Sequence, residues 1–182
     1  MKAIKNYILE KLKIRKSKYN YTPNNSAELI RIVKELINER GKYANLNDID
    51  TSMITDMSRL FYNSEFNGDI SKWDVSNVTN MEMMFAGCNF NGDLSEWDVS
   101  SVSNMEGMFC YAFFNNDSIN TWNVENVTNM KEMFMGSDFK LINERLEKWN
   151  PKSITRIKTI SMFLGCGKGK RPTWYNNLWI KK

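Results

Sequence analysis

The chain has 182 residues and a net charge of +4, with 42% hydrophobic and 25% charged residues. This length suits one domain with a continuous core, and the balance is that of an ordinary globular protein. No run of about 18 apolar residues occurs, which excludes a membrane-spanning helix. The sequence contains no histidine, so the usual general base and the commonest metal ligand are missing, and we expect a protein that is not an enzyme.

The charge is unevenly distributed. Residues 1–48 carry a net +6, residues 49–139 a net −11 and residues 140–182 a net +9. An acidic body between two basic ends can steer a charged partner, although solvated charged faces explain the same pattern.

Two further features predict a cytoplasmic protein. The first residues have no apolar core and no small-residue cleavage site, and so do not form a signal peptide. The three cysteines, Cys88, Cys110 and Cys166, are an odd number without zinc-site spacing. They are typical of small buried thiols in a reducing compartment.

The N-terminal residues 1–48 predict a helical cap. Apolar residues between Ile4 and Leu12 recur at helical spacing, which indicates a short basic helix. A second helix is marked by Asn25 as N-cap, Glu28 three residues later and Gly41 just past its end. A stack of repeats requires such a cap, because its first unit otherwise exposes apolar surface.

A unit of about 24 residues repeats through the middle of the chain, at 66–89, 90–113 and 114–138. Residues 49–66 form a partial first copy, and an irregular last copy reaches Phe163. A fixed period in this range predicts stacked supersecondary units that bury their apolar sides against one another. The repeated core positions are Ile49, Trp73, Trp97, Trp122 and Trp149; Ile54, Val78, Val102, Val127 and Ile154; Met57, Met81, Met105, Met130 and Ile157; Phe61, Phe85, Phe109, Phe134 and Phe163.

Within each unit the pattern predicts a short strand and then a short helix. Residues 72–76 alternate polar and apolar, as a strand does. Thr79–Glu82 and Ser103–Glu106 fit capping boxes, and Met81, Met84 and Phe85 follow at helical spacing. Residues 49–163 therefore predict an α/β solenoid of about five coils, a leucine-rich-repeat-like stack of short parallel strands and short helices.

The C-terminal residues 164–182 are aromatic and basic. The candidate residues are Lys168, Lys170, Arg171, Trp174, Tyr175 and Trp179. We expect the aromatic side chains to close the open end of the last coil. Alternatively, lysines interleaved with aromatic rings form a nucleic-acid-binding surface.

Residues 49–139 closely resemble the BspA-like leucine-rich-repeat family in its Mycoplasma-lipoprotein-type form. The resemblance is carried by the motif F-N-G-D-[IL]-S-x-W-D-V-S-x-V-[ST]-N-M-x-x-M-F, which is present almost intact twice, and by the lead-in at residues 28–61. It implies a binding scaffold without a fixed function. Many members are secreted or lipid-anchored surface proteins. Because this sequence shows no export signal, carriage by a phage or mobile element is a reasonable context.

An acidic ladder is the sharpest candidate for a metal site. Asp69, Asp93 and Asp117 share one repeat position, and Asp74 and Asp98 share another. Stacked carboxylates repel unless they are hydrogen-bonded or neutralised, and calcium could neutralise them. We instead expect each Asp to accept backbone N–H bonds at its own turn, with no metal or cofactor.

The outward positions at which the copies disagree are candidate binding residues, because the core does not dictate them. One row holds Lys72, Glu96, Thr121 and Lys148, and a second holds Ser76, Ser100, Glu125 and Lys152. These rows predict a non-enzymatic scaffold that binds another protein inside a cell. A more concrete hypothesis is a phage or mobile-element inhibitor of a host defence complex, such as an anti-CRISPR protein. The alternatives are a nucleic-acid-binding or nucleoprotein-binding protein that uses its basic ends, and a bacterial surface adhesin.

Overall fold

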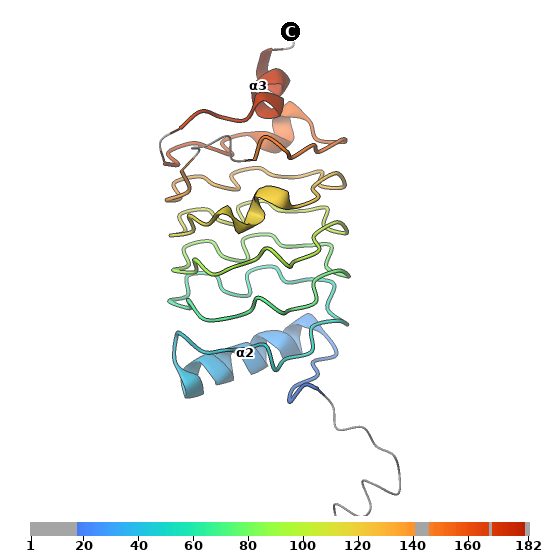
Figure 1. Cartoon of the computed structure of the whole chain (residues 1–182), viewed down its shortest axis with the longest axis vertical. Helices are drawn as coiled ribbons and strands as arrows, with labels where there is room; N and C mark the ends of the chain where they lie inside the picture. Colours follow the sequence, from blue (N-terminus) through green and yellow to red (C-terminus); the bar gives the residue numbers. More distant parts are fainter. Residues whose placement is uncertain (1–17, 141–145, 168, 181–182) are drawn as a thin grey trace, which may run out of the picture.

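The chain winds into a stack of irregular coils with a helix at each end (Figure 1). In this computed structural model, residues 18–140, 146–167 and 169–180 are described. Their helices are α2 (Ser26–Arg40) and α3 (Thr173–Ile180), with the short 3₁₀ helices η1 (Asp117–Thr121) and η2 (Arg156–Thr159). None of these helices is long and apolar enough to cross a membrane.

The observed boundaries of helix α2 confirm the prediction. The Asn25 side chain accepts the Glu28 N–H at 3.0 Å, and the Glu28 carboxylate accepts the Asn24 N–H at 2.9 Å. Gly41 ends the helix with φ 84°, and its N–H donates to the carbonyl of Ile37. The buried face of α2 joins the core of the stack and consists of Leu29, Ile32, Val33 and Leu36. The other predicted helix, at residues 4–12, lies outside the described residues.

The predicted α/β solenoid of parallel strands and helices is wrong. The described part of the chain contains no strand, and the five bridges that join two described residues are isolated and parallel, such as the one from Asn80 to Asn104. Turns flank that bridge on both sides, so consecutive residues do not pair as in a strand. The predicted helix after Asn80 is absent because Met83 has φ 51° and Gly87 has φ 65°, whereas an α-helix needs φ near −60°.

Neighbouring coils are joined by backbone hydrogen bonds, and those of residues 81–87 and the equivalent segments all run to the next coil, whereas others run back, as from the Thr79 N–H to the carbonyl of Thr55 at 2.8 Å. The Met81 N–H donates to the carbonyl of Asn104, one coil further along, at 2.9 Å. The same bond recurs at every second residue up to Gly87, while the N–H groups of Met84 and Ala86 close turns within their own coil. The donors in four successive coils are Met57, Arg59, Phe61 and Asn63; Met81, Met83, Phe85 and Gly87; Met105, Gly107, Phe109 and Tyr111; Met130, Glu132, Phe134 and Gly136.

Amide side chains form a second ladder beside the bridges. The Asn104 side-chain N–H donates to the Asn80 side-chain oxygen at 3.1 Å, and Asn129 donates to Asn104 at 3.0 Å. Asn80 also accepts the Glu82 N–H, so Asn80 rather than Thr79 caps this turn. The residues of the predicted capping boxes are therefore hydrogen-bonded, but no helix follows them.

The core confirms the predicted anchor positions, with one exception. All the Trp, Val, Met and Phe anchors are buried. The rings of Phe61, Phe85, Phe109, Phe134 and Phe163 stack with centroids 5.4, 5.6, 5.6 and 5.7 Å apart. A second column stacks beside it and consists of Phe66, Phe90, Phe114 and Phe139.

Ile157 is the exception. Its side chain is 66% exposed, and the buried Thr159 takes the Met position of the last coil instead. The ladder fixes this register, because the Met130 N–H donates to the carbonyl of Lys158 just as Met105 donates to Asn129. The last coil has two additional residues before this position, and they are accommodated in η2.

Candidate functional site

The predicted row Lys72, Glu96, Thr121 and Lys148 lies on the outside of the stack. Each of its residues directly precedes the buried Trp of its coil and is exposed. Among the described residues, none of the four side chains makes a hydrogen bond or an ion pair. Lys72 and Glu96 line a solvent-open depression of about 580 Å³ together with Lys18, Asp74 and Asp93. The depression is therefore lined by charges of both signs.

The second predicted row is held by contacts within the protein. The Ser76 hydroxyl donates to the Asp74 carboxylate at 2.6 Å. Lys152 forms an ion pair with Glu125 at 2.7 Å. Ser76, Ser100 and Glu125 are also only half-exposed. The row Lys72, Glu96, Thr121 and Lys148 is thus the one whose side chains are available to a partner.

The acidic positions form turns, as expected. Asp69, Asp93 and Asp98 each accept the backbone N–H of the serine two residues later, at 3.0, 2.9 and 3.0 Å. The hydroxyl and the backbone N–H of Ser100 lower the pKa of Asp98. In the described part of the chain, no three His, Cys, Asp or Glu side chains gather as metal ligands would.

The third coil departs from the predicted ladder of carboxylates. Asn116 accepts the Ser118 N–H at 2.9 Å and so takes the turn-forming role of Asp69 and Asp93. Asp117, which we expected at that position, instead begins η1. This copy has one extra residue between Phe114 and Trp122 and forms η1 there, and its turn begins one residue earlier after Phe114 than the turns at Asp69 and Asp93 do after Phe66 and Phe90.

The basic C-terminal candidates lie around α3, on the last coil. Tyr175 is buried and packs edge-to-face on Phe163, with ring centroids 4.9 Å apart. Arg171 lies over the Tyr175 ring at 5.7 Å, and Arg156 lies over the Trp179 ring at 4.4 Å. Lys170 and Arg171 are exposed, whereas Lys168 lies outside the described residues. Because its ring is buried, Tyr175 is not available to stack on a base.

Trp174 continues the series of repeated tryptophans by one position beyond Trp149. The indole N–H of Trp149 donates to the carbonyl of Ile119 at 3.0 Å, and that of Trp174 donates to Leu146 at 2.9 Å. The same bond is made by Trp73, Trp97 and Trp122. The spacing from Trp149 to Trp174 matches the repeat length, so the sequence could have predicted that Trp174 makes the same indole hydrogen bond.

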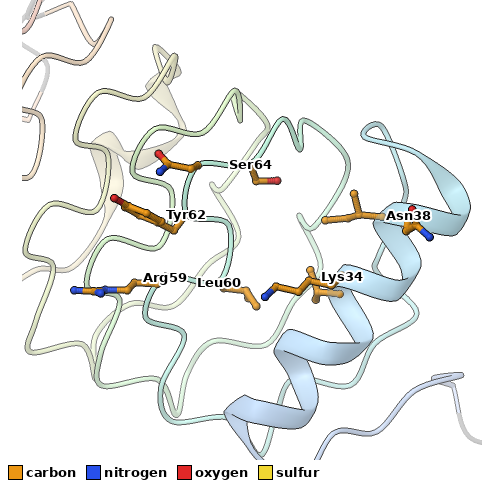
Figure 2. A pocket seen from close by; sticks show the side chains of 9 residues that line it. Lys34, Asn38, Arg59, Leu60, Tyr62 and Ser64 are labelled. Atoms are coloured by element: carbon orange, nitrogen blue, oxygen red, sulfur yellow. The ribbon is translucent and has the colours of Figure 1, made fainter.

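A groove between α2 and the first coil was not predicted from the sequence. Its volume is about 480 Å³, and Figure 2 shows the Lys34 side chain extending from α2 toward Leu60. Arg59 and Tyr62 line the groove on the coil side, and Tyr62 is 49% exposed. One feature of the sequence could have indicated the groove. Tyr62, Ala86, Cys110 and Met135 share one repeat position, and only the first of them has an aromatic ring.

Comparison with known proteins places the chain at family level. Neither a search of curated proteins nor a search of solved structures found a match. A family model described as "Mycoplasma protein of unknown function, DUF285" matches residues 32–140 and residues 113–173. This match supports a Mycoplasma-type repeat family, which is a coarser statement than the BspA-like resemblance. Because the two matched segments cover well over half of its length, the chain belongs to this Mycoplasma protein family of unknown function, DUF285.

Proposed function

We propose that this protein is a non-enzymatic scaffold that binds another protein along the row Lys72, Glu96, Thr121 and Lys148. The observation that carries the proposal is that these exposed side chains have no hydrogen bond or ion pair among the described residues, although the positions around them are bonded. Side chains that the fold does not use are free to contact a partner.

The spacing of the row favours a macromolecule as the partner. Paired backbones lie about 5 Å apart, so four successive coils present an extended line of contacts rather than a single small-molecule pocket. The charges along this line are positive, negative, neutral and positive. Such a pattern selects a partner with the complementary order of charges and affects association rate and specificity more than affinity.

In its more concrete form, the proposal is that the partner belongs to a host defence complex and that the protein is its inhibitor, in the manner of an anti-CRISPR protein. Small size, segregated charge and a repeat scaffold support this form. Membership in a family of unknown function does not choose between it and a BspA-like surface adhesin.

Quantitative affinity purification can test the proposal. The full chain is compared with the double variant Lys72→Glu, Glu96→Lys and with Lys170→Glu, whose site is exposed at the basic end. Lysates are used with and without nuclease, and the recovered proteins are measured by mass spectrometry. We expect a protein partner that survives nuclease, binds the Lys170→Glu variant normally and is lost from the double variant.

The same experiment separates the alternatives. Recovery that depends on nucleic acid and is lost with Lys170→Glu would favour nucleic-acid binding through the basic end. A set of partners that is unchanged by the double variant would contradict the proposed row. Absence of any defence component among the lost partners would contradict the inhibitor form.

A further inference from the structure

The first coil leaves one edge of the backbone ladder open. In each later coil, the carbonyls at the positions equivalent to Ser58, Leu60 and Tyr62 accept N–H groups from the preceding coil. In the first coil, none of these three carbonyls accepts a hydrogen bond from a described residue. Because the carbonyls of the later coils point toward the preceding coil, these three point toward α2.

Helix α2 occupies only the start of this edge. The Ser26 hydroxyl donates to the carbonyl of Asp56, which is the first position of the row. Beyond it the groove of about 480 Å³ opens, with Lys34 on the helix side and Leu60 and Tyr62 on the coil side (Figure 2). The groove therefore combines apolar contact surface with a line of unpaired backbone acceptors.

We propose that this groove binds an acidic peptide segment of another polypeptide, which extends the ladder of backbone hydrogen bonds by one more segment. Alternate N–H groups of the peptide donate to the carbonyls of Ser58, Leu60 and Tyr62, as backbones do when a segment is added to an open edge. This inference goes beyond the proposed function, because the groove lies at the end of the stack and not on the row that contains Lys72.

The charges decide between an acidic and a basic occupant. Lys34 and Arg59 are the charged residues that line the groove, and both are cationic. Arg59 is paired with Glu82 at 3.1 Å, whereas Lys34 has no ion pair with a described residue. The chain's own first 17 residues carry six basic residues and one acidic residue, and are therefore a poor match to this site.

A peptide copied from the repeat provides the probe, because residues 81–87 already pair in this way with the next coil. The probe has the sequence of residues 78–88 with Cys88→Ser, a fluorescent label and two added glutamates at each end. The control peptide is N-methylated at the nitrogens of Met83, Phe85 and Gly87, which removes the donors and keeps the side chains. Binding to the full chain is measured by fluorescence anisotropy.

We expect saturable binding of the probe and at least about tenfold weaker binding of the methylated peptide, because three hydrogen bonds are lost. Lys34→Glu in the protein should lower the affinity for the probe about fivefold, whereas Lys72→Glu, which lies outside the groove, should leave this affinity unchanged. Equal binding of the two peptides, equal effects of the two variants, or no binding up to about 1 mM would each overturn the proposal. None of these results depends on whether a partner protein binds the row that contains Lys72.

Discussion

The side-chain N–H of Asn104 donates to the side-chain oxygen of Asn80, one coil away, at 3.1 Å. The oxygen of Asn104 in turn accepts bonds from Asn129 in the next coil and from the N–H of Glu106 in its own turn. Each asparagine thus ties a turn to the coils on either side. A repeat position that resembles a helix cap in the sequence is therefore a connection between coils.

Asn104→Ala should destabilise the protein by about 1 to 3 kcal/mol, because it leaves several partly buried groups without their partners. Equilibrium urea denaturation measures this loss. Asn104→Asp keeps the acceptor oxygen and should cost less. Thr121→Ala, at an exposed position without side-chain bonds, should stay within about 0.5 kcal/mol of the parent. Equal stability of the Asn104→Ala and Thr121→Ala variants would contradict a structural role for the asparagine ladder.

Trp97→Phe should cost about 0.5 to 1.5 kcal/mol for the lost hydrogen bond, although it keeps an aromatic ring in the core. The buried indole N–H of Trp97 donates to the carbonyl of Ile70 at 3.1 Å, and phenylalanine removes this bond, while the carbonyl keeps the bond from the Trp73 backbone N–H. The same substitution at Trp179, whose indole N–H has no hydrogen-bond partner among the described residues, removes no such bond and is the control. If the two variants unfold at the same urea concentration, the indole bond does not contribute.

Gly136→Ala should be strongly destabilising for two reasons. Gly136 has φ 64°, and a Cβ built there lies 2.4 Å from the Tyr111 ring. Gly41 has φ 84° and open space around its Cβ position, so Gly41→Ala measures the conformational cost alone, about 1 kcal/mol. Thermal denaturation should give a clearly larger loss for Gly136→Ala than for Gly41→Ala.

A double variant separates the two causes. Tyr111→Ala removes the ring and should restore part of the stability of Gly136→Ala, while the conformational cost remains. If the two substitutions are simply additive, the contact between Tyr111 and Gly136 is not the source of the loss.

Stability should fall between about pH 9 and 11 in a way that depends on Cys88. Burial raises the pKa of this thiol from 9.0 to about 11. Between these values the unfolded chain has released the thiol proton and the folded chain has kept it, so the free energy of unfolding decreases as pH rises. A shift of this size corresponds to about 2 to 3 kcal/mol. Urea denaturation across this range should show a steeper loss for the parent than for Cys88→Ala, and parallel profiles would contradict the assignment.

The core could be predicted from the sequence because packing depends on the period and on side-chain type. Trp73 and Phe85 are buried as expected, and the helix that begins after Asn25 has its predicted caps. Ile157 was misplaced because periodicity alone does not locate an insertion. The ladder bond from Met130 to Lys158 locates it.

The local structure of the repeat could not be predicted because a short helix and a series of turns can both bury the same pattern of apolar residues. Met81, Met84 and Phe85 fall on one face of a helix, but successive turns bury the same three residues. The distinguishing feature is the positive φ of Met83, and its residue type does not indicate this. Gly107 at the same position of the next copy is the one local sign of it.

The candidate sites were predicted only in part. Comparison of copies correctly predicted that Lys72 and Glu96 face outward, and their role in binding stays a prediction. It could not show that Ser76 and Glu125 in the other row are engaged by Asp74 and Lys152. The groove depends on where α2 lies against the first coil, and the sequence does not specify that relationship.

Amide hydrogen exchange followed by NMR tests the central claim, that the ladder of backbone hydrogen bonds from each coil to the next holds the stack together. The amides of Met105, Gly107 and Phe109 donate to the next coil and should exchange only on global unfolding. The equivalent amides of the last coil, at Ser161 and Phe163, donate to no backbone carbonyl of a described residue and should exchange much faster. Equal protection in the central and last coils, or fast exchange at Met105, Gly107 and Phe109, would contradict the account.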